Sequence, residues 1–411
     1  MTPSARGRMF ASLAEQNVRI FFAGLGVSNI GTWAQTTAVI LLIQRLGGGG
    51  LDIGLAVAAQ FVPVLILGLW AGAYADRRDR HRLTMKLQTA MGLQAVALGS
   101  LDLGGLASIP LIYGMQAVFG TLSAIDTPAR RALVTELVEP DRLANVLSLS
   151  TSVMTGARMF GPSLAALLVP SIGTGWVFVL NGVSYLALVG ALASMDTTRF
   201  HRVELGPRSA TPVRDGLRAV WSDMPLRALV LVLAVIATFT FNHLVYMPLL
   251  VAERVGDSER AFGWLLSVLG IGNVAGALSV ARLVIVPIRW FYLGGVALGA
   301  TVIGLAFAPT PWLVFALALP MGAAMTIVIS SASVILQQRS DPAMRGRLLA
   351  LSSVILMGST PIGGPITGLV ADGLGVFWAT AYGGIVAVLA VAIAALSPGS
   401  ATRAADRSLR R

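Results

Sequence analysis

Residues 72–82 read GAYADRRDRHR. They overlap the end of one long apolar stretch, 52–75, and directly precede another, 83–103. The segment carries Asp76, Asp79 and four arginines, whereas each stretch has the roughly 20 mainly apolar residues that a helix needs to cross a bilayer. Short loops rich in arginine stay on the cytoplasmic side of a membrane. The pattern therefore predicts two transmembrane helices joined by a cytoplasmic loop.

The same alternation continues along all 411 residues. Hydrophobic residues make up 55% of the chain and charged residues 12%, about half of the roughly 25% that is usual in soluble domains. We expect an all-α polytopic membrane protein with twelve transmembrane helices. The chain has no cysteine, which excludes disulfides and thiol chemistry. The predicted spans are 18–44, 52–75, 83–103, 107–126, 144–169, 174–194, 226–252, 261–281, 288–307, 311–336, 348–371 and 375–396.

Basic residues fall almost entirely on one side of this topology. With the N-terminus inside, 26 of the 30 Lys and Arg residues lie in cytoplasmic segments, Arg45, Arg254 and Arg260 lie outside, and Arg158 lies within a span. One missed helix would invert every later loop, so the bias supports the span count and places both termini in the cytoplasm. It also accounts for the net charge of +11 without nucleic acid.

The longest polar gap follows the sixth span and divides the chain into halves. Arg142, followed by Gly161-Pro162, corresponds at an offset of 203 residues to Arg345, followed by Gly364-Pro365. Parallel duplication places such matches in the same helix of each half, so we expect two pseudo-symmetric six-helix bundles. The expected parts are a cytoplasmic N-terminal tail (1–17), an N-terminal bundle (18–194), a cytoplasmic linker (195–225), a C-terminal bundle (226–397) and a basic cytoplasmic tail (398–411).

The loop 72–82 also carries a wider pattern. Gly72, Asp76, Arg77 and Arg80 fit Gly-x-x-x-Asp-Arg-x-Gly-Arg-Arg, with Asp79 in place of the second glycine. Together with RIFFAGLGVSNIGTW (19–33) and DTPARRALVTELVEPDRLANVLSL (126–149), this pattern resembles the major facilitator superfamily, in the bacterial branch of the enterobactin exporter and drug-efflux proteins. The resemblance covers nearly the whole chain. It implies the major facilitator fold, a location in the bacterial inner membrane, and a central site surrounded by the first, fourth, seventh and tenth helices.

Two kinds of segment are candidates for a conformational gate. The charged loop can form charge-assisted bonds to neighbouring helix ends. A proline within a span removes an intrahelical bond, and small residues beside it allow close helix approach; the resemblance implies that this Gly-Pro motif favours exporters. The alternatives are an ordinary basic anchor and tolerated kinks. The predicted gate residues are Gly72, Asp76, Arg77, Arg80, Gly161, Pro162, Gly364 and Pro365.

Polar side chains recur at helical spacing in several spans, and these stripes predict a wet path between the halves. Serine and threonine also bond to their own backbone in membrane helices, which is the alternative for each one. The predicted cavity residues are Asn29, Trp33, Thr36, Tyr113, Gln116, Thr155, Arg158, Asn242, His243, Tyr246, Thr326, Ser330 and Ser333.

Two ionisable residues lie deep in predicted spans, Arg158 and His243, where a charge costs at least ~2.5 kcal/mol on insertion scales. Arg158 either attracts an anionic substrate or pairs with an acid such as Asp126. Asp126 stands before Thr127-Pro128, so it could instead cap a helix. Since histidine titrates near neutral pH, His243 and Asp126 are the candidates for proton coupling; a neutral histidine bonded to a neighbouring helix is the alternative.

The sequence contains no phosphate loop, dinucleotide site or metal-ligand cluster, and no catalytic groups converge. We therefore expect no enzyme activity, cofactor or metal. We expect a monomeric transporter that exports small amphiphilic or lipophilic compounds, drug-like or siderophore-like, by alternating access and proton antiport. Its expected partners are the small-molecule substrate, the lipid bilayer and protons, without nucleic acid. The alternatives are a lipid or lysolipid translocator on the same fold and a non-transporting membrane enzyme or scaffold.

Overall fold

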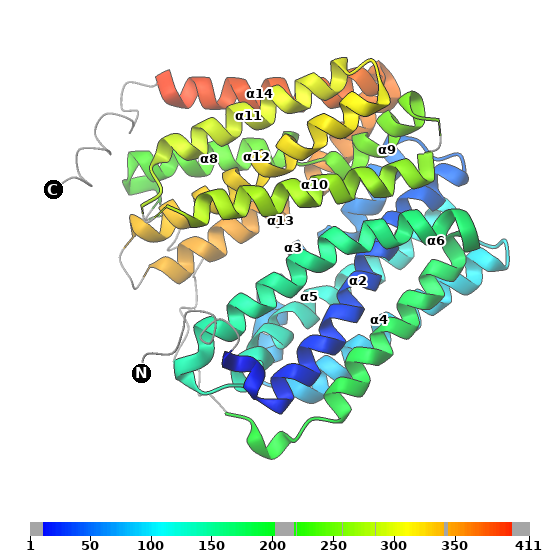
Figure 1. Cartoon of the computed structure of the whole chain (residues 1–411), viewed down its shortest axis with the longest axis vertical. Coiled ribbons are helices and arrows are strands. Elements are labelled where there is room, and N and C mark those ends of the chain that lie inside the picture. Colours follow the sequence, from blue (N-terminus) through cyan, green and yellow to red (C-terminus); the bar gives the residue numbers. More distant parts are fainter. Residues whose placement is uncertain are drawn as a thin grey trace. The chain divides into compact units, whose positions relative to one another are not determined.

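The computed structural model describes residues 11–201, 218, 220–256, 258–283, 285–340 and 344–396. Every regular element in these residues is helical, which confirms the predicted all-α fold class (Figure 1). The C-terminal tail, residues 1–10 and most of the linker lie outside the described residues. The chain divides into two compact units, one of Met1–Leu46 and Ala59–Gly206, the other of Gly47–Ala58 and Pro207–Arg411. The short segment 47–58, at the start of the second predicted span, thus clusters with the second unit.

The first unit holds four of the long helices and most of a fifth. Its elements are η1 (Ala11–Ala14), α2 (Gln16–Arg45), most of α3 (Gly50–Asp76), α4 (Arg80–Leu103), α5 (Ile109–Glu136), η2 (Pro140–Arg142), α6 (Leu143–Ala193) and η3 (Thr197–Arg199). The helix α6 has 51 residues and covers two predicted spans. Gly173 has a φ of 81°, a conformation that residues with a β-carbon rarely adopt. The chain leaves the helix at Gly173, and Figure 1 shows the two arms of α6 that result.

A buried carboxylate joins three helix segments at one end of the first unit. Asp102, near the end of α4, forms an ion pair with Arg45 at the end of α2 and accepts a hydrogen bond from Thr174. Thr174 follows directly after Gly173, so the contact fixes the junction between the two arms of α6. A buried carboxylate with two such partners satisfies its hydrogen-bonding capacity without water.

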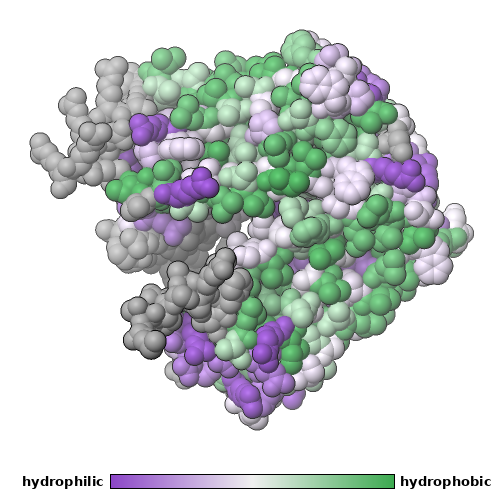
Figure 2. Space-filling model, viewed as in Figure 1, coloured by the Kyte–Doolittle hydropathy of each residue, from purple (hydrophilic) through white to green (hydrophobic). Residues whose placement is uncertain are grey.

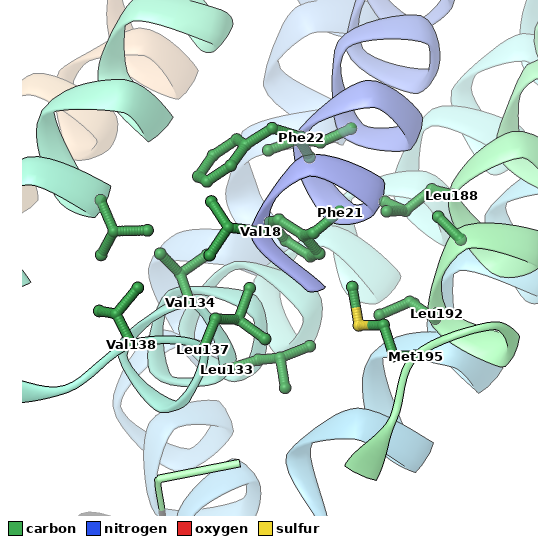
Figure 3. Close-up of a cluster of buried hydrophobic side chains, with 13 residues drawn as sticks. Val18, Phe21, Phe22, Leu133, Val134, Leu137, Val138, Leu188, Leu192 and Met195 are labelled. Carbon is green, nitrogen blue, oxygen red and sulfur yellow. The ribbon is translucent and has the colours of Figure 1, made fainter. Parts of the chain in front are cut away.

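Apolar side chains join α2, α5 and α6 at the opposite end of the unit (Figure 3). Phe21 near the start of α2, Leu133 near the end of α5 and Leu188 near the end of α6 each have no accessible surface. Beside this cluster, His81 Nε2 lies 2.7 Å from the backbone oxygen of Leu192. His81, in the charged segment 72–82, therefore contacts α6 at the edge of this cluster.

The second unit contains the remaining helices and the first residues of α3. Its elements are α8 (Met224–Phe239), α9 (His243–Arg254), α10 (Ser258–Ala281), α11 (Ile288–Phe307), α12 (Pro311–Gln338), α13 (Arg345–Leu374) and α14 (Val376–Leu396). Each predicted span from 261–281 onward coincides with one of these helices to within a few residues. The expected seventh span, 226–252, does not form a single helix: it divides into α8 and α9.

The break between α8 and α9 is held by side chains. The hydroxyl of Thr240 donates to the backbone oxygen of Gly383 on α14 at 2.7 Å, and Asn242 Nδ2 donates to the backbone oxygen of Thr238 at 2.7 Å. Both side chains are buried. These bonds replace part of the helical ladder, which explains why the helix can stop within an apolar segment. The stretch Met224–Arg254 is one candidate membrane span, as predicted. The sequence gives no proline or glycine signal at the break itself, so the break was not predicted.

The outer surface of the helices is strongly apolar. Within the described residues, eight helices are long and apolar enough to cross a membrane, and Figure 2 shows apolar residues over much of the face in view, with hydrophilic residues mostly toward helix ends. The helices α2, α4 and α5 are not among the eight, because polar side chains such as Asn29, Gln88 and Gln116 interrupt their apolar sequence. An apolar exterior combined with polar interior faces is what a protein that crosses the membrane several times requires.

Candidate functional site

The charged loop after α3 is anchored to its own unit. Asp79 caps α4, since its Oδ1 accepts a hydrogen bond from the backbone N–H of Arg82 at 2.8 Å. Arg80 forms an ion pair with Glu136, the last residue of α5, and both side chains are largely buried. Asp76 ends α3 and lies exposed together with Arg77, while Gly72 is half-buried. The predicted bond to a neighbouring helix end is therefore made by Arg80, and the gating role of the loop stays a prediction.

Gly161, a predicted gate residue on α6, lies at a close contact between α6 and α2. A β-carbon at Gly161 would stand 2.4 Å from the Cβ of Trp33 and 2.8 Å from the backbone oxygen of Ile30, which is far inside van der Waals contact. Pro162 is buried within the same continuous helix. Only glycine permits this packing, as in small-residue interfaces of membrane helices generally.

The repeated Gly-Pro motif makes a similar contact in the second unit. Gly364 on α13 packs against Gly54 near the start of α3, where an added β-carbon would meet the backbone oxygen of Gly364 at 2.5 Å. The neighbouring Pro365 is half-buried. Two turns further along α13, Asp372 accepts hydrogen bonds from the backbone N–H groups of Gly50 at 2.7 Å and of Leu51 at 2.9 Å. Sequence reasoning missed Asp372, although its spacing of eight from Gly364 places it on the same helix face.

Arg158 carries the most distinctive contact of the predicted cavity residues. Its guanidinium lies 4.7 Å from the centre of the Trp33 ring, and the side chain of Arg158 is exposed while that of Trp33 is half-buried. None of the acidic side chains in the described residues forms an ion pair with Arg158. A cation stacked on an aromatic ring with one face accessible is an arrangement that can bind an anionic or aromatic group.

The other polar residues predicted for the first unit mostly satisfy bonds within the protein. Asn29 donates to the backbone oxygen of Leu25 at 3.0 Å, and Thr36 donates to that of Thr32 at 3.0 Å. Gln116 donates to Gln60 on α3 at 3.1 Å, a partner that the sequence pattern did not identify. Thr155 and Tyr113 are half-buried. For Asn29 and Thr36 the structure thus favours the alternative of bonding to their own helix.

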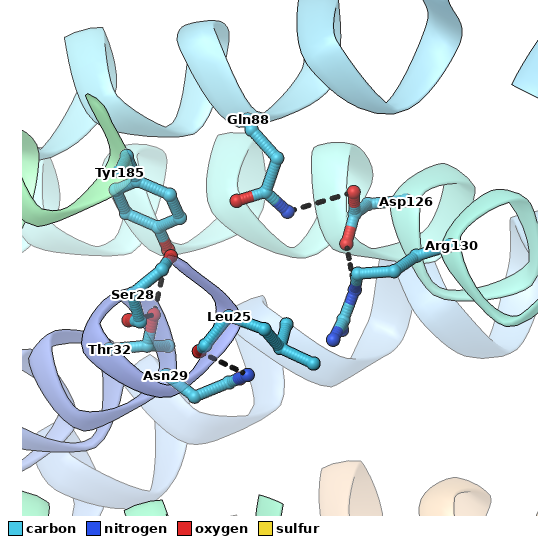
Figure 4. A network of polar contacts seen from close by, with 8 residues as sticks. All are labelled: Leu25, Ser28, Asn29, Thr32, Gln88, Asp126, Arg130 and Tyr185. Carbon is cyan, nitrogen blue, oxygen red and sulfur yellow. Dashed lines mark hydrogen bonds and ion pairs between the residues drawn. The ribbon is translucent and has the colours of Figure 1, made fainter. Parts of the chain in front are cut away.

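Asp126 belongs to a buried polar network on α5 (Figure 4). Only 1% of Asp126 is exposed; one carboxylate oxygen accepts from Gln88 at 2.9 Å and the other pairs with Nε of Arg130 at 3.0 Å. The helix α5 continues from Ile109 to Glu136, so the expectation that Asp126 caps a helix was wrong: Pro128 lies within the helix. The proposed pairing of Asp126 with Arg158 is replaced by the pair with Arg130.

The predicted residues of the second unit gather at the break between α8 and α9 and on α12. Asn242 precedes α9 and His243 begins it. Tyr246 is 2% exposed, and its hydroxyl lies 3.8 Å from the sulfur of Met321. Asn242 and Tyr246 are therefore packed inside the unit rather than exposed to a passage. On α12, Thr326 donates to Asn273 at 3.0 Å, Ser333 donates to its own helix at 2.9 Å, and Ser330 is half-buried.

The fold and these side chains are typical of a multi-pass membrane transporter. The helices are apolar outside, and the second unit contains a helix that is interrupted between α8 and α9. The cation of Arg158 is accessible within a predicted span. Interrupted helices and ionisable groups within spans are typical of substrate pathways in membrane proteins. No group of residues suited to hold a metal ion occurs in the described part of the chain.

A family model described as transmembrane secretion effector matches residues 8–410, and the chain belongs to this family of the major facilitator superfamily. This confirms the resemblance seen in the sequence. The members of this family are transporters, so the protein is a secondary transporter of small molecules and not an enzyme.

Several transporters are similar in sequence to this chain over most of their length. The chain is 21% identical to the staphyloferrin A transporter of Staphylococcus aureus, over 87% of this chain and 90% of the relative. It is 26% identical to the multidrug efflux pump Tap of Mycolicibacterium fortuitum (87% and 89%) and 23% identical to macrolide efflux protein A of Streptococcus pyogenes (90% and 93%).

Solved structures agree on the fold. The nucleoside transporter NupG, as a D323A mutant, aligns with a TM-score of 0.75 at 12% identity, over 91% of this chain and 98% of the other. A bacterial homologue of the iron transporter ferroportin aligns with a TM-score of 0.71 at 16% identity, over 92% and 98%. At these identities the likeness establishes the major facilitator fold alone.

Proposed function

We propose that this protein exports small amphiphilic or lipophilic compounds across the bacterial plasma membrane by alternating access, in exchange for protons. The observation that carries the proposal is the stacking of Arg158 on Trp33 at 4.7 Å, with Arg158 exposed. A guanidinium in a membrane span is costly to keep. Because the described residues offer it no carboxylate partner, Arg158 is available to a substrate.

The substrate class follows from the scarcity of charge around this contact. One cation beside an aromatic ring fits an amphiphilic molecule with a single anionic or π-rich group, whereas sugar phosphates and highly charged metabolites would need more cations. The names of the relatives support this class, since one is a staphyloferrin A transporter and others are multidrug and macrolide efflux proteins.

The proposed gates are the close helix contacts of the two Gly-Pro motifs and the charged loop. Gly161 packs on α2 in the first unit, Gly364 packs on the start of α3 in the second, and the Arg80–Glu136 pair holds the loop. Small-residue contacts form and separate without rotamer changes, which suits helices that exchange partners during transport. In this proposal the protein is a monomer, and both termini lie in the cytoplasm because arginine-rich loops stay inside.

Proton coupling is assigned to Asp126, with His243 as the competing candidate. Asp126 is a buried carboxylate held by Arg130 and Gln88, so its protonation would remove the charge that holds Arg130. His243 begins α9, beside the helix break that joins α9 to α8. Each site would link protonation to a local rearrangement, and at Asp126 the cation that would be released is Arg130, 3.0 Å away.

Uptake into energised inside-out membrane vesicles tests the proposal. We expect vesicles with the wild-type protein to accumulate a radiolabelled macrolide or a catechol monoanion, and Arg158→Ala to lower the affinity for the monoanion about tenfold, the value of one charge-assisted hydrogen bond of roughly 1.5 kcal/mol. Arg131→Ala, on α5, serves as a basic-residue control. Absence of uptake for every compound would contradict export, and unchanged affinity for all of them in Arg158→Ala would remove Arg158 from the site.

Proton exchange is tested in the same vesicles by the release of protons that accompanies uptake. Asp126→Asn should bind substrate but release no protons, whereas His243→Gln should leave proton release unchanged. The reverse result would assign coupling to His243. Proton release that persists in both variants would exclude both residues.

A further inference from the structure

We infer that the second unit holds a groove for one acyl chain of an anionic phospholipid, between α8 and α14, with Arg227 as the contact for the lipid phosphate. The inference goes beyond transport, because the lipid would be a resident partner and not the exported substrate. It depends on the shape, depth and charge of a single cavity.

The groove has a volume of about 490 Å³. Its walls are apolar side chains of α8 and α14, and among the described residues Arg227 is the one charged residue that lines it. Three of the lining residues, Ala228, Ala390 and Ala394, are alanines, so the hollow exists because small side chains face each other. Leu231 and Leu389 on its walls are 48% and 54% exposed, which is expected for surfaces that contact hydrocarbon.

The groove is about as deep as one leaflet of a bilayer. Its lining on α8 extends from Met224 to Val235, which is about 16 Å at the helical rise of 1.5 Å per residue. A hydrocarbon core is about 30 Å thick, so half of it corresponds to this depth. The groove therefore matches one acyl chain that enters from a single membrane surface.

Arg227 lies at the surface end of the groove. It is in the second turn of α8, which begins at Met224, and is half-buried. No acidic side chain of the described residues forms an ion pair with it, although Asp223 lies one turn earlier. Just before α8, Trp221 is 53% exposed, and tryptophan marks the level of lipid headgroups. Within the described residues, the apolar groove thus ends at headgroup level in a cation without an acidic ion-pair partner. Such a groove is complementary to a phospholipid with a net negative charge, whereas the choline cation of a zwitterionic phospholipid offsets the charge of its phosphate.

The test measures lipid binding to the purified protein by native mass spectrometry, after delipidation and addition of phosphatidylglycerol or phosphatidylcholine with identical acyl chains. We expect one phosphatidylglycerol to bind more tightly than phosphatidylcholine. Arg227→Gln should weaken that binding about fivefold, since one basic residue near the surface contributes about 1 kcal/mol. Arg227→Lys should retain most of it. Arg289→Gln is the matched control, because Arg289 is exposed in the first turn of α11 and does not line the groove.

A second variant fills the groove and leaves Arg227 intact. Ala228→Leu with Ala390→Leu should reduce phosphatidylglycerol binding as Arg227→Gln does, so a folding defect in one variant does not decide the result. Equal binding of the two lipids by the wild type would overturn the inference. Unchanged phosphatidylglycerol binding in Arg227→Gln, or in the filled groove, would overturn it as well.

Discussion

The guanidinium of Arg158 on α6 lies 4.7 Å from the centre of the Trp33 ring on α2. This contact places a permanent cation on an aromatic surface within the first unit. A contact with the ring restricts the guanidinium, so less conformational entropy would be lost when a substrate binds. The pair therefore acts as a preformed recognition element in the proposed function.

Trp33→Leu should weaken substrate binding even though Arg158 keeps its charge. A cation–π contact contributes about 0.5–2 kcal/mol, so we expect the affinity to fall by a factor of about two to thirty. Equilibrium binding of the labelled monoanion to purified protein measures this. Trp176→Leu, which removes a half-exposed tryptophan elsewhere on α6, should leave the affinity unchanged; equal losses in both variants would show a general effect of tryptophan removal.

Gly161→Ala should destabilise the first unit and slow transport. The added β-carbon would stand 2.4 Å from Trp33 Cβ, and overpacking of this kind costs about 1–3 kcal/mol. The control is Gly156→Ala on the same helix, where an added β-carbon meets nothing within 4 Å and alanine should be neutral or stabilising by up to about 1 kcal/mol. Thermal unfolding in detergent compares the two. A melting temperature for Gly161→Ala at or above that of Gly156→Ala would show that the close contact is not needed.

The Arg80–Glu136 pair should stabilise the protein more than an exposed pair does. Its side chains are 12% and 13% exposed, whereas those of Arg199 and Asp196 are 64% and 47% exposed. We expect Arg80→Gln to lower the free energy of unfolding by about 1–3 kcal/mol because Glu136 stays behind without its partner, and Arg199→Gln to change it by less than about 1 kcal/mol. A double-mutant cycle with Glu136→Gln isolates the pair, and a coupling energy near zero would contradict its role.

Asp76→Asn should slow conformational exchange without unfolding the protein. Asp76 is exposed at the end of α3, and asparagine has nearly the same size and shape, so the substitution should not disturb packing. Hydrogen exchange under transport conditions and thermal unfolding measure the two properties separately. Asp79→Ala provides the contrast: Asp79 caps α4, and loss of the cap should lower stability by about 1 kcal/mol and have less effect on exchange. Normal exchange rates in Asp76→Asn would contradict a gating role.

Apolar periodicity and loop charge predicted the positions of most helices, because bilayer thickness fixes the length of a span. They did not predict where helices extend beyond the membrane. The fourth span was expected to end at Asp126, but α5 continues to Glu136, since Pro128 is accommodated and Arg130 is neutralised by Asp126.

Side-chain partners were harder to predict than helices. The stripe containing Asn29 and Thr36 correctly marks a polar face, yet periodicity does not distinguish a hydroxyl that faces a passage from one bonded to its own helix, as these residues are. The break at Thr240–Asn242 depends on a contact with Gly383, more than a hundred residues away. Such contacts arise from tertiary packing and leave no local signal.

Substrate accumulation in proteoliposomes with an imposed pH gradient, acidic inside, is the most direct test of proton-coupled export. The account predicts that transporters inserted with their cytoplasmic side outward concentrate substrate in the lumen above the external concentration. A protonophore should abolish this accumulation. The variant Asp126→Asn should show only downhill exchange of substrate. Accumulation that persists with the protonophore, or that does not depend on the gradient, would contradict it.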